Sequence, residues 1–228
     1  MVYMNIVELK NIQKIYITGK ITLPVLKEID LNIGKGEMLA IMGPSGSGKS
    51  TLMHIIGLLD RPTKGDLWLN GEKIDLSLPD KKLANLRSEK IGFVFQFFYL
   101  LPRMTALSNV LMPTTYRKRG KADREKRAVG ILEEVGLKER INHKPSELSG
   151  GENQRLAIAR ALINDPEIIL ADEPTGNLDS KSGKDVMESL RNLNKKRGKT
   201  VVVITHDEKI AAYCDRIVKL FDGKIISN

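Results

Sequence analysis

The feature that constrains this chain most is a glycine-rich segment, Gly43–Ser50, with the sequence GPSGSGKS. It fits the pattern G-x-x-x-x-G-K-[ST] of a phosphate-binding loop. The glycines let the backbone turn tightly, so that successive N–H groups can point at phosphate oxygens. Lys49 can place an ammonium group near the β- and γ-phosphates, and the Ser50 hydroxyl can bind Mg²⁺. The segment predicts a nucleotide-binding loop formed by Gly43, Pro44, Ser45, Gly46, Ser47, Gly48, Lys49, Ser50 and Thr51.

The flanking residues support this interpretation. Met38–Met42 is a short apolar run, as expected of a buried strand, and Ser50–Leu59 has a helical pattern that ends before Pro62. Strand, loop and helix in this order are the context that a phosphate-binding loop requires. The helix would add its positive N-terminus to the anion site.

Composition limits the possible classes of protein. The chain has 228 residues, 41% of them hydrophobic, which suits one globular unit with room for a subdomain. Cys214 is the single cysteine, so an internal disulfide is excluded. No apolar run approaches the roughly 20 residues that span a bilayer. We therefore expect a soluble chain that works at a membrane only through a partner. The net charge of +9 would suit nucleic acid or acidic lipid. Part of it lies in 117–127, which we interpret as a solvated helix face.

The order of apolar segments predicts an α/β fold. Strand patterns at 91–95, 168–171, 201–204 and 216–220 (expected as the last strand) alternate with helical patterns, which favours a parallel sheet with crossovers. Alternating segments at 6–16 and 25–33, with an Asn70-Gly71 hairpin, indicate an antiparallel region. The predicted fold is a P-loop NTPase core with a mainly parallel sheet, an antiparallel β subdomain and an inserted helical subdomain. We expect a single domain, 1–228, with the core and antiparallel region in 1–96 and 165–228 and the helical subdomain in 97–164.

Two further segments carry chemistry. Asp172 follows an apolar strand, where its carboxylate can hold Mg²⁺ beside the Ser50 oxygen. Glu173 comes next and can orient and deprotonate an attacking water molecule. The segment Leu148–Glu152, LSGGE, predicts a second anion site at a helix start. Ser149 is a good N-cap, and the two glycines after it leave backbone N–H groups uncovered.

With these motifs in this order, the chain resembles an ATP-binding-cassette (ABC) nucleotide-binding domain over nearly its whole length. LSGGE corresponds to the family signature LSGGQ, so Glu152 departs from the commonest sequence. The resemblance assigns roles to single residues: Gln96 of the Q-loop, Asp172 of Walker B, Glu173, Asp179 of the D-loop, the switch histidine His206, and Tyr16 as the aromatic residue that stacks on adenine.

The resemblance also implies a mechanism. Two copies would close head to tail around two ATP molecules, each lying between the P-loop of one chain and the signature of the other. Ser149, Gly150, Gly151 and Glu152 would then meet the ATP of the partner chain. Gln96 would sense the metal and the attacking water, and His206 would contact the γ-phosphate. Asp179 would communicate between the two sites. The cofactors implied are ATP and Mg²⁺, the latter held by Ser50, Gln96 and Asp172.

Within the family, the segments PSGSGKST, FVFQFFYLLPRMTALSNV and TGNLDS resemble the subfamily of lipoprotein release and macrolide efflux. This implies a cytoplasmic ATPase bound to the inner face of the membrane through a separate permease, for export or extraction of a lipophilic or peptide-like cargo. One alternative is the same ATPase used for transmembrane signalling, as in cell-division relatives. Another is a nucleic-acid-linked cassette ATPase. Those commonly carry a long coiled coil between Q-loop and signature, whereas 97–147 shows no sustained heptads. We expect no nucleic acid partner.

Overall fold

The computed structural model describes residues 4–19, 21–115 and 121–227. Within these residues the central sheet has six strands in the order β10-β9-β3-β8-β7-β6. The pairs β9–β3, β3–β8, β8–β7 and β7–β6 are parallel, and β10 is antiparallel to β9. The strands are β3 (Met38–Met42), β6 (Ile91–Phe95), β7 (Ile168–Asp172), β8 (Thr200–Thr205), β9 (Arg216–Phe221) and β10 (Lys224–Ser227).

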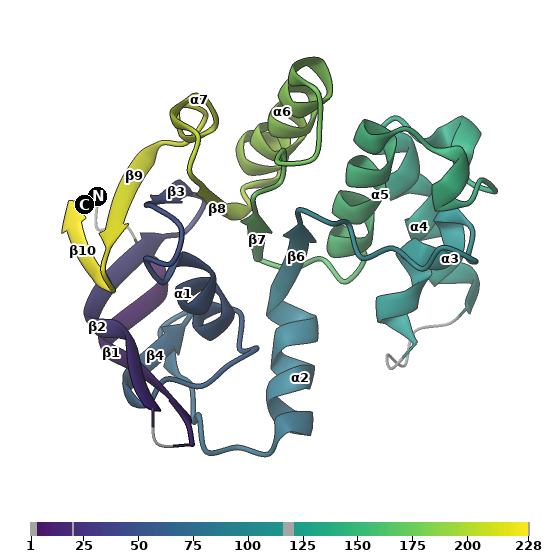
Figure 1. Cartoon of the computed structure of the whole chain (residues 1–228). Helices are drawn as coiled ribbons and strands as arrows, with labels where there is room; N and C mark the ends of the chain where they lie inside the picture. Colours follow the sequence, from purple (N-terminus) through teal and green to yellow (C-terminus); the bar gives the residue numbers. More distant parts are fainter. Residues whose placement is uncertain (1–3, 20, 116–120, 228) are drawn as a thin grey trace.

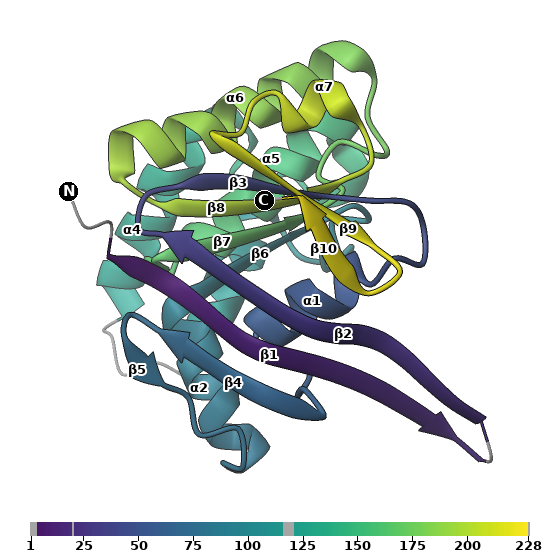
Figure 2. The ribbon, with the colours of Figure 1, turned by 90° about the vertical axis from the view of Figure 1, so that its left-hand side faces the viewer.

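A second, antiparallel sheet has the order β2-β1-β4-β5. Its strands are β1 (Asn5–Thr18), β2 (Ile21–Gly34), β4 (Lys64–Leu69) and β5 (Glu72–Lys73). The long strands β1 and β2 run beneath the central sheet and extend past it, as Figure 2 shows. The pair contains register shifts, one of them at Asn11, which has a φ of 51°.

Helices cover the central sheet on both faces. Helix α1 (Lys49–Ile56) lies between the two sheets, and α6 (Ser180–Arg197) and α7 (Glu208–Ala211) lie on the opposite face (Figures 1 and 2). The segment 97–164 contains α3 (Ala106–Leu111), α4 (Lys121–Glu134) and α5 (Gly150–Leu162), which gather beyond β6 (Figure 1). Helix α2 (Asp80–Lys90) leads into β6, and short 3₁₀ helices η1 (Met112–Thr114), η2 (Lys138–Arg140) and η3 (Pro145–Glu147) connect the others. Among the residues that the structure describes, no helix combines the length and the apolar character needed to cross a membrane.

The central sheet packs apolar side chains on both faces because successive residues of a strand point to opposite sides. In β3, Leu39 and Ile41 join the cluster that contains α1 and the antiparallel sheet. Met38 faces the other cluster, which contains α5 and α6. All five side chains of β3 are buried, so the strand before the phosphate-binding loop is held firmly on both sides.

The predicted fold class is confirmed, with differences in detail. The strand at 216–220 is not the last, because β10 follows the Asp222-Gly223 turn. The helix expected to reach Leu59 ends at Ile56, with Gly57 as its C-cap. In the basic run, Arg117, Lys118 and Arg119 lie outside the described residues. The interpretation of that run as a solvated face is wrong for Arg127, which is partly buried and donates to the Ile163 carbonyl at 2.7 Å.

Candidate active site

The carboxyl ends of the parallel strands open into a cavity of about 810 Å³. Ligands of open α/β sheets bind at these strand ends, where the strand order changes direction. Here β3 lies between β8 and β9, and the glycine-rich loop follows it directly. The cavity is lined by Leu23, Val25, Pro44, Ser45, Gly46, Gly48, Lys49, Ser50, Thr51, Gln96, Asp172, Glu173, Ile204 and His206.

The glycine-rich loop has the geometry of an anion cradle. Gly48 is the N-cap of α1 with a φ of 104°, a conformation that favours glycine, and α1 has no side-chain cap. Gly43 approaches the strand β9 so closely that a Cβ there would lie 2.1 Å from the Leu220 carbonyl oxygen. Lys49 is only 9% exposed, and its ammonium donates to the carbonyls of Gly43 and Pro44 at 2.8 Å each. A helix N-terminus and a lysine therefore face the same cavity, as a triphosphate requires.

Ser50 and Asp172 both line the cavity, and the Ser50 hydroxyl forms a hydrogen bond with the Asp172 carboxylate. Burial raises the pKa of Asp172, and the nearby Glu173 carboxylate raises it further. Lys49, His54 and the hydrogen bond to Ser50 act in the opposite direction. A buried carboxylate beside a hydroxyl is an oxygen donor set of the kind that Mg²⁺ prefers. These residues therefore fit a magnesium ion bound next to the phosphates.

Glu173 and His206 form a pair at the tips of two neighbouring strands. Asp172 pairs with Ile204 in the β7–β8 register, so the residues just beyond both strands lie close together. His206 Nδ1 lies 2.7 Å from Glu173 Oε1. Glu173 is 19% exposed, whereas His206 is 73% exposed. The φ of Glu173 is 43°, a backbone strain that is common where a side chain is held for function.

Gln96 follows β6 and lines the same cavity. Its side-chain amide donates to Asn177 Oδ1 at 3.3 Å, and Asn177 donates back to the Gln96 carbonyl at 3.0 Å. This reciprocal pair ties the end of β6 to the loop before α6. Asn177 was not singled out as a site residue, because an asparagine in a loop carries no chemical signal of its own.

The LSGGE segment does not reach the cavity. Ser149 is the N-cap of α5, whose position beyond β6 and β7 is visible in Figure 1. The Ser149 hydroxyl accepts from the Glu152 backbone N–H at 3.3 Å, and the Ser149 N–H donates to Glu152 Oε2 at 2.8 Å. Among the described residues, the cavity lining does not include Ser149, Gly150, Gly151 or Glu152. The chain therefore carries two predicted anion sites that face different surroundings.

Asp179 and Tyr16 also lie outside the cavity lining. Asp179 caps α6 and accepts from the N–H groups of Lys181 and Ser182 at 3.0 Å each. The Tyr16 hydroxyl donates to Asp60 Oδ2 at 2.7 Å. The pKa of Tyr16 is raised, first by burial and then by Asp60, while the hydroxyl of Thr51 lowers it. Because Thr51 lines the cavity, Tyr16 lies at its rim.

Three apolar residues that line the cavity, Leu23, Val25 and Ile204, were not predicted as site residues. Leu23 and Val25 belong to β2, and Ile204 belongs to β8. Leu23 and Val25 belong to an ordinary strand pattern, so only their position beside the glycine-rich loop distinguishes them. Together, the cavity offers an anion cradle, two oxygen donors for a cation, and a carboxylate–histidine pair that can act on water.

Comparisons with known proteins identify the family of the chain. The sequence model of the ABC transporter family matches residues 26–176. The chain is 49% identical to the lipoprotein-releasing system ATP-binding protein LolD of Geobacter metallireducens, over 98% of this chain and 99% of that protein. It is 51% identical to the macrolide export ATP-binding/permease protein MacB of Escherichia coli, over 98% of this chain but 34% of MacB.

The fold matches a solved structure of the ATP-binding cassette MJ0796, described as the dimeric post-hydrolysis state bound to ADP and Pi. The TM-score is 0.88 at 49% identity, with 97% of each chain covered. The relative MJ0796 comes from Methanocaldococcus jannaschii. The chain therefore belongs to the ABC transporter family, as an ATP-binding subunit that hydrolyses ATP.

Proposed function

We propose that two copies of this chain close head to tail around two ATP molecules and drive a separate membrane permease. The observation that carries this proposal is the division of the site. The P-loop, Walker B carboxylates and His206 line one cavity, whereas the signature residues at the start of α5 face elsewhere. A second copy would bring its signature to the open side of the cavity. The solved structure of MJ0796, which is described as dimeric, supports the pairing of two copies.

Within such a site, each described residue has a chemical task. Lys49 and the N-terminus of α1 bind the β- and γ-phosphates, and Tyr16 stacks on the base. Ser50, Asp172 and Gln96 hold Mg²⁺, which when bound neutralises phosphate charge. Glu173 accepts a proton from water as the water oxygen attacks the γ-phosphorus and the bond to the bridging oxygen breaks. His206, 2.7 Å from Glu173, keeps that carboxylate oriented toward the water.

The proposed contact with the permease is a groove beside β6, which we call the β6 groove. It has a volume of about 540 Å³. It is lined by Leu59, Ala84, Arg87, Ser88, Ile91, Gly92, Phe93, Phe95, Tyr99, Met112, Pro113, Arg160, Ala161 and Asn164. Tyr99 at its edge is 63% exposed, and neighbouring Phe97 is 65% exposed. Exposed aromatic residues around a groove are typical of protein-binding sites.

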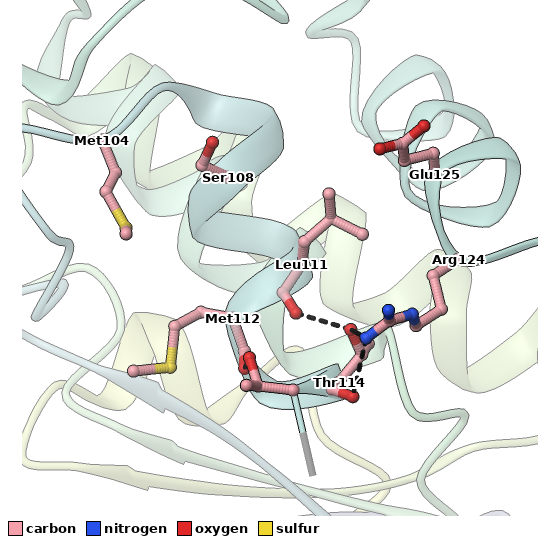
Figure 3. Close-up of a pocket in the computed structure, with 8 residues that line it drawn as sticks. Met104, Ser108, Leu111, Met112, Thr114, Arg124 and Glu125 are labelled. Atoms are coloured by element: carbon pink, nitrogen blue, oxygen red, sulfur yellow. Dashed lines mark hydrogen bonds between the residues drawn. The ribbon is translucent and has the colours of Figure 1, made fainter. Parts of the chain in front are cut away.

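A smaller cavity of about 260 Å³ continues this surface between α3 and α4. Figure 3 shows Met104 and Met112 on one side of it and Arg124 reaching Thr114 on the other. Both methionines are partly exposed, and their flexible thioethers adapt to a partner surface. Because Gln96 precedes this surface directly, a permease bound here would sense the state of the ATP site.

The names of two relatives support the proposed cargo class. LolD belongs by name to a lipoprotein-releasing system and MacB to macrolide export. We infer export or extraction of a lipophilic or peptide-like cargo, with this subunit at the cytoplasmic face of the membrane. MacB is by name an ATP-binding/permease protein, whereas we propose that the subunit described here works with a permease on another chain.

The test is co-purification from detergent-solubilised native membranes. Tagged wild-type chain is expected to retain a multispanning membrane protein with an external domain. Tyr99→Glu in the β6 groove should abolish that capture, because it places a charge against an apolar partner. Ile21→Glu, at an exposed position of the distant β1–β2 hairpin, serves as the matched control and should retain it.

Other outcomes of this experiment contradict the proposal in different ways. Recovery of nucleic acid or of a soluble complex alone would exclude the permease. A captured permease whose reconstituted complex hydrolyses ATP but moves no lipoprotein, lipid or peptide would favour transmembrane signalling.

A further inference from the structure

Glu152 stands where the ABC signature commonly has glutamine, and the structure shows two tasks for its carboxylate. Oε2 accepts the Ser149 N–H at 2.8 Å and completes a capping box at the start of α5. Oε1 accepts from Arg140 Nε at 3.2 Å. Arg140 is the last residue of η2, twelve residues earlier in the chain. Its side chain is 46% exposed and that of Glu152 is 21% exposed.

This arrangement creates an electrostatic conflict for an ATP site. Glu152 lies in the first turn of α5, where a carboxylate and a phosphate would share the same positive helix end. A phosphate that approached Ser149 and Gly151 would therefore meet a like charge. Glutamine at this position, being neutral, would create no such repulsion.

Arg140 compensates for this charge. The hydrogen bond from the Ser149 N–H lowers the pKa of Glu152 most, and the Ser149 hydroxyl and Arg140 lower it further. The carboxylate is thus ionised at neutral pH. Nη1 of the same guanidinium lies 3.5 Å from His143 Nε2. Without Arg140, a full negative charge would stand at the signature loop.

We propose that Arg140 is a positioning residue of the signature. It neutralises Glu152 and holds the carboxylate on the Ser149 N–H, so that the loop accepts the γ-phosphate of an ATP bound to a second copy of this chain. The inference rests on the head-to-tail dimer of the proposed function and explains how a glutamate serves in that dimer.

The test is a double-mutant cycle on ATP-driven dimerisation. All variants carry Glu173→Gln, and sedimentation velocity measures the fraction of dimer at each ATP concentration. Arg140→Gln should raise the ATP concentration at half-maximal dimer by about threefold for each site, the scale of an exposed ion pair. The ATP concentration at half-maximal dimer of Glu152→Gln is the reference for the double variant. In that background, Arg140→Gln should add no further change, because the charge that Arg140 neutralises has gone.

Two controls separate this role from a structural one. Lys138→Gln removes a positive charge from the same 3₁₀ helix, where Lys138 pairs with Glu133, and should leave dimerisation unchanged. The defect of Arg140→Gln should shrink as NaCl is raised, because salt screens the exposed carboxylate. Binding of a fluorescent ATP analogue to the monomer should stay the same, since Arg140 is absent from the lining of the cavity.

Three outcomes would overturn the inference. An equal defect of Arg140→Gln with and without the Glu152→Gln substitution would mean that Arg140 binds ATP directly or supports folding. Unchanged dimerisation of Arg140→Gln would mean that the charge needs no compensation. A Glu173→Gln parent that stays monomeric with ATP would overturn the proposed function itself and this inference with it, whereas the first two outcomes leave the dimer intact.

Discussion

The P-loop cavity and the signature loop both present a helix N-terminus, but they are held in place differently. Lys49, Gln96, Glu173 and His206 lie on segments that follow β3, β6, β7 and β8, and the main-chain ladder of these strands fixes the segments relative to one another. The signature loop is held by side chains that bond to main-chain groups. Asn153 donates to the carbonyls of Pro145 and Leu148, and Gln154 donates to the Pro174 carbonyl at 2.6 Å.

These two ways of holding a loop suit two different requirements of an ATP site, chemistry and recognition. Chemistry needs groups fixed to a fraction of an ångström, and a buried parallel sheet provides that. In the proposed dimer, recognition of a second copy needs an exposed loop, and the signature loop begins a helix of the group α3, α4 and α5 that lies beyond β6 in Figure 1. Gln154 connects the two parts, because it lies on α5 and donates to the Pro174 carbonyl in the loop after β7.

The largest expected effect comes from disabling each region separately. Glu173→Gln and Ser149→Ala should each lower ATP hydrolysis by about 100-fold or more, the usual effect of losing a proton acceptor or an oxyanion-type donor. The two variants should differ in assembly. Glu173→Gln with ATP should elute as a dimer on a sizing column, whereas Ser149→Ala should stay a monomer that still binds ATP. Weaker ATP binding by monomeric Ser149→Ala would contradict the assignment of Ser149 to the ATP site of a second copy.

Mixing two inactive variants should restore part of the activity. Lys49→Ala damages the P-loop and Ser149→Ala damages the signature, so a mixed dimer has one site with both halves intact. With random pairing and independent sites, about a quarter of wild-type phosphate release should return, because half of the dimers carry one good site. Each variant measured alone is the control. Activity no higher than the sum of the two would contradict sites shared between chains.

Removal of a buried side chain should show how much the stability of the segment 97–164 depends on hydrogen bonds from side chains to main-chain groups. Asn109 is fully buried, accepts from the Leu101 N–H at 2.8 Å and donates to three carbonyls, including that of Thr105 at 3.1 Å. Asn109→Ala should lower the free energy of unfolding by about 2 kcal/mol, because buried main-chain groups lose their partner. Urea titration measures this, with exposed Asn85→Ala of α2 as the control. An equal loss of unfolding free energy in the two variants would contradict a stabilising role for the Asn109 hydrogen bonds.

The smallest effect concerns the ionisation of Asp172. Burial raises its pKa, so the folded chain binds more protons than the unfolded chain between the ordinary pKa and the raised one. Stability then falls as pH rises through that window, and ionised Asp172 destabilises the fold at neutral pH.

Asp172→Asn should therefore raise the stability at pH 7 by about 1 kcal/mol, or about 2–4 °C in Tm for a chain of this size, while hydrolysis is lost. The gain should shrink as pH is lowered toward the ordinary pKa of aspartate. Calorimetry at several pH values checks this. Asp75→Asn, at an exposed turn where hydrogen bonds to Ser77 lower the pKa, should show no such gain.

Local sequence patterns account for most of the observed elements. The apolar runs at 38–42 and 91–95 coincide with β3 and β6 because strands buried on both faces leave an uninterrupted apolar signal. Strand β10 was missed, since three of its four residues are exposed and the pattern is too short. Helices α3 and α7 have six and four residues, below the length at which periodicity is distinct.

For the site, the sequence alone determined the chemical groups and the phosphate-binding loop. A cradle of backbone N–H groups is built within eight consecutive residues, and the family resemblance supplied the more distant partners. Only the tertiary structure decided which groups share a cavity, because that depends on strand order and register. The β7–β8 register places Glu173 beside His206, and the packing of α5 beyond β6 keeps the signature away from the P-loop. The contact of Arg140 with Glu152 likewise depends on how η2 packs against α5, and no pattern of residue types specifies that in advance.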